Sequence, residues 1–164
     1  LIDELAKQGD ERSYKFPIGL KDSKDTRLSF SGLKTSLRQM VEKYPLKQSG
    51  DEQRLKDLCA SYQKAIVKAL ELKTRFALNL AKEKTNMKSL PLVLGGGVAC
   101  NSKLRQVFRK SFEKVEIVPP QFCTDNGAMI ACMGLRTLKE NQISFPQCLE
   151  IDAKSRFINK GNFL

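Results

Sequence analysis

The stretch LPLVLGGGVACNSKLR, residues 90–105, constrains the fold of this chain more than any other segment. A short apolar run, three consecutive glycines and an amphipathic segment opened by Asn101 predict a strand, a tight turn and a helix. The turn has two interpretations. Glycines let a ligand approach the backbone closely, and the start of a helix offers unpaired N–H groups to a phosphate or ribose. The alternative is a buried strand and helix that bind nothing.

The residues after this stretch predict its geometry. Residues 98–112 are expected to form a helix, and VEIV at 115–118 a second strand that ends before two prolines. A connection of strand, helix and strand is right-handed and parallel in nearly all proteins. The turns at 95–97 and 124–125 are therefore predicted to lie at one edge of a parallel sheet, where open α/β sheets bind their ligands. A further helix is expected after the second turn, from residue 128 to 138.

The remaining segments predict a helix-rich α/β fold, which we expect to form one domain over residues 1–164 and to end in a tail at 144–164. The amino-terminal residues predict a short helix that stops at Gly9, and a polar loop follows at 10–27. The remaining expected elements are a short strand at 27–30, a helix at 32–44, and one long helix or two in succession at 51–84. The apolar stripe of that last segment is expected in the core, with its lysines and arginines on a solvated face.

Two side chains near the turns carry alternative roles. Asp125 can cap the helix that follows it, or it can serve as a hard oxygen ligand for a divalent metal beside a phosphate or carbonyl. Asn101 can hydrogen-bond a ligand, or only the backbone of its own turn.

Composition limits the possible chemistry. The 164 residues include no histidine, which removes catalysis by serine–histidine or cysteine–histidine pairs and any imidazole metal ligand from this chain. Five widely spaced cysteines indicate neither a disulfide framework nor a zinc cluster. The net charge of +11 favours a polyanionic partner such as a nucleic acid. Without a membrane span or a secretory signal in the sequence, we expect a cytoplasmic protein.

Three sequence blocks together resemble one family. SFSGLKT at residues 29–35, LVLGGGVACNSKLR at 92–105 and PPQFCTDNGAMIA at 119–131 are similar to motifs of the bacterial TsaD family, also called Gcp or YgjD, which are tRNA N6-adenosine threonylcarbamoyltransferases. The helix ASYQKAIVKALELKTRFAL also looks like the connecting helix of that family. Cys100 stands where the family block usually has alanine.

The resemblance implies the second half of an actin-like ATPase fold and transfer of threonylcarbamoyl from threonylcarbamoyl-AMP to the adenosine 3′ of the tRNA anticodon. It implies that Gly96, Gly97 and Asn101 contact the adenylate and that Asp125 ligates one divalent metal, iron or zinc. The upstream HxxxH pair that binds this metal in the family is absent, so this chain, which begins with Leu1, looks like a carboxyl-terminal half that is inactive alone.

Expected partners are tRNA, a paralogous actin-like protein of the TsaB type and an ATPase of the TsaE type. The sequence has two alternative interpretations of function. One is a non-catalytic module that binds tRNA or a protein partner. The other is a metalloprotease, an older label for this family, which the sequence disfavours because it contains no HExxH motif.

Overall fold

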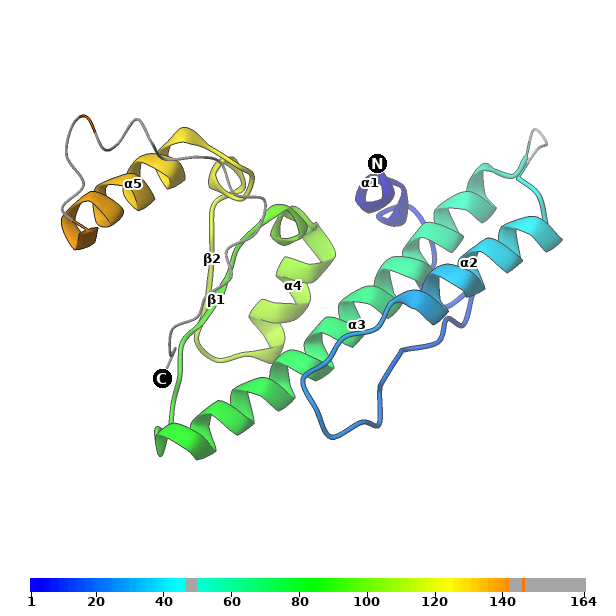
Figure 1. The fold of residues 1–164 in the computed structure, drawn as a ribbon. Coiled ribbons are helices and arrows are strands. Elements are labelled where there is room, and N and C mark those ends of the chain that lie inside the picture. Colours follow the sequence, from blue (N-terminus) through cyan, green and yellow to red (C-terminus); the bar gives the residue numbers. More distant parts are fainter. Residues whose placement is uncertain (47–49, 142–145, 147–164) are drawn as a thin grey trace. The chain divides into compact units, whose positions relative to one another are not determined.

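The structure is a computed structural model that describes residues 1–46, 50–141 and 146. It divides into two compact units, Leu1–Thr124 and Asp125–Leu164, and each unit is described here by itself. The described residues form a helix-rich α/β fold with two parallel strands, as the sequence predicts (Figure 1). In this part of the chain, no helix is both long enough and apolar enough to span a bilayer. The expected single domain and the cytoplasmic location stay predictions.

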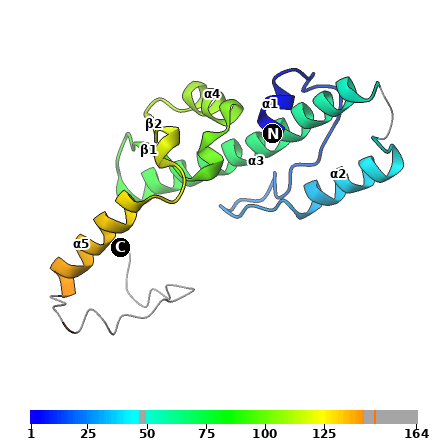
Figure 2. The ribbon, with the colours of Figure 1, turned by 90° about the horizontal axis from the view of Figure 1, so that it is seen from above.

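A single helix, α3 (Glu52–Thr85), is the axis of the first unit. Its sequence contains neither proline nor glycine, so the backbone hydrogen bonds continue without a break and the alternative of two helices is wrong. The helix ends at Asn86, whose φ of 53° is a left-handed conformation common at helix ends. Figure 2 shows α3 running between α4 (Ser102–Ser111) and α2 (Ser31–Lys43).

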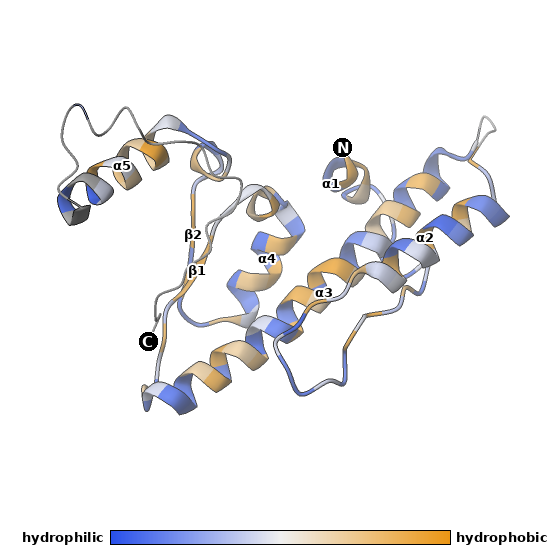
Figure 3. Cartoon of the chain, viewed as in Figure 1, coloured by the Kyte–Doolittle hydropathy of each residue, from blue (hydrophilic) through white to orange (hydrophobic). Residues whose placement is uncertain are grey.

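Packing on more than one side of α3 changes which of its residues are buried. Apolar residues recur along the helix (Figure 3), and Leu58 and Ala69 are buried as expected, whereas Leu80 is exposed. The predicted solvated face is wrong in part, because elements far apart in sequence cover the helix. Four polar residues of α3 are buried: Ser61, Gln63, Glu71 and Lys73.

The amino-terminal helix α1 (Ile2–Ala6) packs against α3 and is shorter than predicted. Gly9 lies beyond its end and has a different role from closing the helix. A Cβ atom at Gly9 would lie 2.1 Å from the backbone oxygen of Lys56. Glycine therefore allows the chain to cross close to α3, and the backbone N–H of Asp10 then donates to the Asp57 carboxylate at 2.8 Å.

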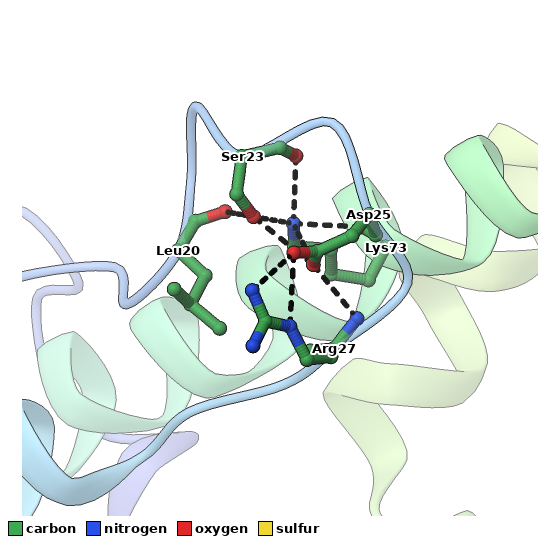
Figure 4. A network of polar contacts seen from close by, with 5 residues as sticks. All are labelled: Leu20, Ser23, Asp25, Arg27 and Lys73. Atoms are coloured by element: carbon green, nitrogen blue, oxygen red, sulfur yellow. Dashed lines mark hydrogen bonds and ion pairs between the residues drawn. The ribbon is translucent and has the colours of Figure 1, made fainter.

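The loop at 10–27 is confirmed, but the strand predicted at 27–30 is wrong. An extended strand needs a hydrogen-bonded neighbour, and the two-stranded sheet of the described residues does not include this segment. Buried Lys73 holds the preceding loop instead (Figure 4). Its ammonium donates to the backbone oxygens of Ser23 and Asp25 at 3.0 and 2.9 Å, and to the Ser23 hydroxyl at 2.6 Å.

The same loop contains a carboxylate that stays ionised to low pH. Hydrogen bonds from the Arg27 side chain lower the pKa of Asp25 to about 2. Its carboxylate also lies 3.6 Å from the Lys73 ammonium. Since the pKa is lower in the folded chain than the ordinary value of 3.8, the contribution of Asp25 to stability is present at neutral pH and disappears as the pH falls toward 2.

Replacing Lys73 with methionine tests the role of this ammonium. The variant keeps a long side chain but leaves two loop carbonyls without their charged donor, so we expect about 2 kcal/mol less free energy of unfolding. Urea unfolding followed by circular dichroism measures the change. Lys84→Met, on an exposed part of the same helix, is the control and is expected to stay within about 0.5 kcal/mol. Equal stability of the two variants would contradict the assigned role.

The predicted parallel sheet is confirmed and lies next to α4. Strand β1 (Leu92–Leu94) pairs in parallel with β2 (Val115–Ile117), in the register Leu92 to Val115. One face of α4 packs against α3 because its apolar residues recur at helical spacing. The core of the first unit is the cluster of four buried residues Val67, Leu104, Phe108 and Phe112.

The second unit contains one described helix, α5 (Gly127–Asn141). The predicted helix at 128–138 is therefore confirmed, with one more residue at its start and three at its end. Its first turn is capped by Asn126, whose side-chain oxygen accepts a hydrogen bond from the backbone N–H of Met129 at 3.1 Å. The tail predicted at 144–164 lies outside the described residues, apart from residue 146.

Candidate functional site

The glycine turn follows β1 directly and has the shape that the sequence predicts. Gly96 has φ 85° and ψ 167°, a conformation that is essentially restricted to glycine. A Cβ atom at Gly95 would make ordinary contact with Val118, at 3.4 Å, but one at Gly96 or Gly97 would meet nothing within 4 Å. The backbone conformation explains Gly96. None of the described residues requires Gly97 to be glycine, and the space beside it is open among them.

The helix after the turn begins later than predicted. Residues Gly97–Cys100 form a short 3-10 helix, η1, and α4 starts only at Ser102. Asn101 lies between them in an extended conformation and caps α4, since its side-chain oxygen accepts from the backbone N–H of Leu104 at 2.9 Å. The sequence shows that the residues of η1 and α4 include apolar side chains, but it does not show the extended residue Asn101 that separates the two helices.

Three backbone N–H groups at the start of α4, those of Ser102, Leu104 and Arg105, are bonded within the protein. Asp3, from α1, accepts from the Ser102 backbone N–H at 3.0 Å and from the Ser102 hydroxyl at 2.8 Å. Asn101 accepts from Leu104, as described above. A carboxylate at this position is favoured by the positive end of the helix dipole. The N–H groups of Ser102 and Leu104 are therefore already used within the protein, and binding of a phosphate near this helix start stays a prediction.

The charge of Asp3 is maintained by its contacts. Burial acts to raise the pKa of this carboxyl group, but the hydrogen bonds from Ser102 and the nearby charge of Lys7 outweigh it, so the pKa is below its ordinary value. Asp3 is therefore ionised at neutral pH and acts as a second cap of α4. This contact joins residues 99 positions apart in the sequence.

Asn101 is held by a residue that the sequence analysis did not single out. Its side-chain nitrogen donates to the side-chain oxygen of Gln63 at 2.9 Å, and Gln63 lies buried in α3. The turn role of Asn101 is thus observed. Its predicted ligand role stays a prediction and requires the second N–H of the same amide. A glutamine in the middle of the apolar stripe of α3 was the available signal.

Arg105 is a second residue with a role that the sequence alone did not predict, and it connects the glycine turn to the end of β2. Its Nε donates to the backbone oxygen of Ala99 at 2.5 Å, and its Nη2 donates to that of Val118 at 2.8 Å. The side chain thus fixes the 3-10 turn η1 against the neighbouring strand. Arginine at the end of the block GGGVACNSKLR was the signal.

Asp125 is exposed and is the first residue of the second unit. The observed cap of α5 is Asn126, so the structure gives Asp125 no need to cap the helix. The glycine turn belongs to the first unit, and the predicted meeting of the two turns at one sheet edge stays a prediction. The first unit therefore contains Gly96, Gly97 and Asn101, whereas Asp125 belongs to the second unit.

The described part of the chain contains no ready-made cluster of metal-donor side chains. Among the described residues, no three histidine, cysteine, aspartate or glutamate side chains lie close enough together to hold a metal ion. The sequence contains no histidine. An exposed aspartate supplies at most one or two oxygen ligands, and a tightly held metal needs more. A metal at Asp125 would need further ligands besides this carboxylate.

The geometry first defines a class of protein. A parallel strand–helix–strand unit, with a glycine turn at the carboxyl end of its first strand, defines an α/β protein. The family model described as TsaD, tRNA N6-adenosine threonylcarbamoyltransferase, matches residues 1–132. The chain belongs to this family, and the resemblance carried by the three sequence blocks is confirmed.

Curated relatives agree with the family match. A tRNA N6-adenosine threonylcarbamoyltransferase of Thermosipho africanus is 42% identical over 91% of this chain and 43% of its own length. The protein of the same name from an Anaeromyxobacter species is 45% identical over 81% of the chain and 39% of its own length. That of Syntrophus aciditrophicus is 43% identical over 96% of the chain and 44% of its own length. The chain thus spans about two fifths of the length of these relatives.

Proposed function

We propose that this chain is part of a tRNA N6-adenosine threonylcarbamoyltransferase. The observation that carries the proposal is the family match over residues 1–132, which includes both the glycine turn and Asp125. In the proposed reaction, the exocyclic amine of the adenosine 3′ of the anticodon attacks the carbamoyl carbon of threonylcarbamoyl-AMP. A carbon–nitrogen bond forms, the bond from that carbon to the phosphate oxygen breaks, the amine loses a proton, and AMP leaves.

The glycine turn is proposed to form one wall of the adenylate site. The open space beside Gly96 and Gly97 supports this role, because a side chain there would occupy the position of a ligand that contacts the backbone. Asn101 would donate its second amide N–H to the substrate while Gln63 and the helix cap fix its orientation. The ligand is thus placed against η1 rather than against the start of α4.

Asp125 is proposed to supply one ligand to a divalent metal, iron or zinc, in the complete enzyme. Its exposed carboxylate is a suitable hard oxygen donor. Asn126 caps α5, so the Asp125 carboxylate is not needed as the cap of this helix. The described residues contain no metal centre of their own, so no step of the reaction is assigned to a metal here. For the same reason the 164-residue chain is proposed to be inactive alone.

The proposed partners are tRNA, a TsaB-type paralogue with the same actin-like fold and a TsaE-type ATPase. The net charge of +11 supports tRNA binding, because lysine and arginine that contact phosphates release condensed counterions. The family membership supports the actin-like ATPase fold for the complete protein. A module that binds tRNA without catalysing the transfer is the alternative that the same charge favours.

Gly97→Ala tests the proposed adenylate wall. The new methyl group meets none of the described residues within 4 Å, so we expect the stability to change by less than about 1 kcal/mol. In the substrate complex the methyl group would clash, and modification of tRNA is expected to fall by roughly tenfold or more. Mass spectrometry of nucleosides from cells that depend on the protein carrying this chain measures the threonylcarbamoyladenosine content.

The matched control is Gly134→Ala, on α5, where an added Cβ also meets nothing within 4 Å. This variant is expected to retain normal modification. Normal modification by the Gly97 variant would remove the adenylate wall from the proposal. Absence of the modified nucleoside even with the unchanged protein would favour the non-catalytic binding module.

A further inference from the structure

Two cysteines of the first unit lie at facing turns. Cys100 is the last residue of η1, and Cys123 follows the second 3-10 turn, η2 (Pro120–Phe122). The two turns pack against each other. Cys100 is exposed to solvent, whereas Cys123 is buried, and neither is in a disulfide in this structure. One thiol is thus accessible to a reagent and the other is protected beside it.

The contacts of the two residues converge on one carbonyl group. The Cys100 thiol donates to the backbone oxygen of Pro120 at 3.9 Å, and the backbone N–H of Cys123 donates to the same oxygen at 3.1 Å. The Cys123 thiol lies on the same side of the turn as Arg105, whose Nη2 donates to its sulfur at 3.6 Å while Nε of the same guanidinium donates to the Ala99 oxygen, one residue before Cys100. Because the two turns pack against each other and both cysteines contact the Pro120 carbonyl, the two side chains lie in the same small region of the first unit.

The two carbonyl oxygens that now accept from the thiols, those of Val118 and Pro120, each keep another donor when the two sulfurs are joined. The Cys123 thiol now donates to the Val118 oxygen at 3.3 Å, but that oxygen also accepts from Arg105 at 2.8 Å. The Pro120 oxygen keeps the backbone N–H of Cys123. Loss of both thiol hydrogens therefore avoids the usual cost of an unpaired buried acceptor.

We propose that Cys100 and Cys123 form a reversible disulfide when the protein meets a low-molecular-weight disulfide oxidant. The deprotonated sulfur of Cys100 attacks one sulfur of the oxidant, forms a mixed disulfide and releases one thiolate. The sulfur of Cys123, after losing its proton, then attacks Cys100 and releases the second thiolate. The two cysteines lose two electrons in total, the oxidant is reduced to two thiols, and the two protons end on them.

The bond would connect the two segments that carry the candidate site. Cys100 immediately precedes Asn101, and Cys123 lies two residues before Asp125. In the reduced protein the two turns are held by hydrogen bonds that involve Arg105 and the thiols. A covalent bond removes the freedom of η1 and η2 to move apart, so the oxidised state fixes the backbone between the glycine turn and the end of the first unit.

The test uses the full chain with Cys132→Ser, so that each relevant tryptic peptide has one cysteine. Trypsin releases residues 89–103 with Cys100 and residues 115–136 with Cys123. After incubation of the native protein with oxidised glutathione and blocking of free thiols, mass spectrometry is expected to find these peptides joined. The joined pair is expected to exceed every other cysteine pair by roughly tenfold or more, since the two thiols have a high effective concentration. Dithiothreitol is expected to reverse it.

Two further variants make the result decisive. Cys100→Ser is expected to abolish the joined peptide, and Cys59→Ser, a control in α3, is expected to leave it unchanged. Circular dichroism checks that each variant is folded. Separate peptides that carry glutathione, or no modification, in the folded protein would overturn the proposal. Pairing of Cys123 with Cys59 or Cys148 in preference to Cys100 would overturn it as well.

Discussion

Replacing Asp125 with alanine is expected to abolish threonylcarbamoyladenosine in cells that depend on the protein carrying this chain, while leaving the protein folded. The carboxylate is exposed, and Asn126 provides the observed cap of the following helix, so the free energy of unfolding is expected to change by less than about 0.5 kcal/mol. If the carboxylate ligates the proposed metal, its loss removes a donor that alanine cannot replace. A reduction of at least about 100-fold is expected.

The measurement is mass spectrometry of nucleosides from purified tRNA, together with a thermal unfolding curve of the variant. Glu113→Ala removes an exposed carboxylate from the first unit and serves as the control. It is expected to retain normal modification. If the Asp125 variant is folded and modifies tRNA normally, the metal-ligand role is excluded. If it is unfolded, the carboxylate has a structural role that the exposed position does not indicate.

The fold was predictable where its cause lies within a few neighbouring residues. The helical period of α3, the apolar runs of β1 and β2 and the glycines between strand and helix each follow from local sequence. The parallel pairing followed from a general rule about crossover connections. The strand predicted at 27–30 failed because alternation of polar and apolar residues does not show whether a partner strand exists. Lys73 lies 50 and 48 residues after Ser23 and Asp25, and it holds this adjoining loop instead.

The candidate site was predictable in position but not in its internal contacts. The glycines and Asn101 lie in the expected turn. The sequence could not show that Asp3 occupies the start of α4, because the contact spans nearly the whole first unit. It also could not show that Gln63 holds the amide of Asn101, since a glutamine in an apolar stripe has no partner until α3 and α4 pack together. Both contacts depend on tertiary structure.

These contacts change where a ligand can bind. Two N–H groups at the start of α4, those of Ser102 and Leu104, are used by Asp3 and Asn101. The open space lies one turn earlier, beside Gly96 and Gly97. Capping by the protein's own residues makes α4 a rigid support whose stability does not depend on a ligand. The proposed site is thus a preformed glycine turn held from behind by a capped helix.

Replacing Phe108 with alanine is expected to cause the largest loss of stability of any substitution proposed for this chain. Phe108 is 2% exposed and lies in the core cluster of the first unit, with its ring centroid 5.1 Å from that of Phe112. Removing a buried ring leaves a cavity between α3, α4 and the sheet, and costs about 3–5 kcal/mol. Because α4 supports the glycine turn, the loss also loosens the proposed adenylate wall.

Urea unfolding of the full chain measures the change, with the denaturant dependence expected to stay the same. Met87→Ala, just beyond the end of α3, is the control, since Met87 is 50% exposed, and its effect is expected to stay within about 0.5 kcal/mol. A loss below about 1 kcal/mol for the Phe108 variant would mean that the core can collapse around the missing ring. In that case α4 would be held mainly by its caps, and Asp3→Ala would become the more damaging substitution.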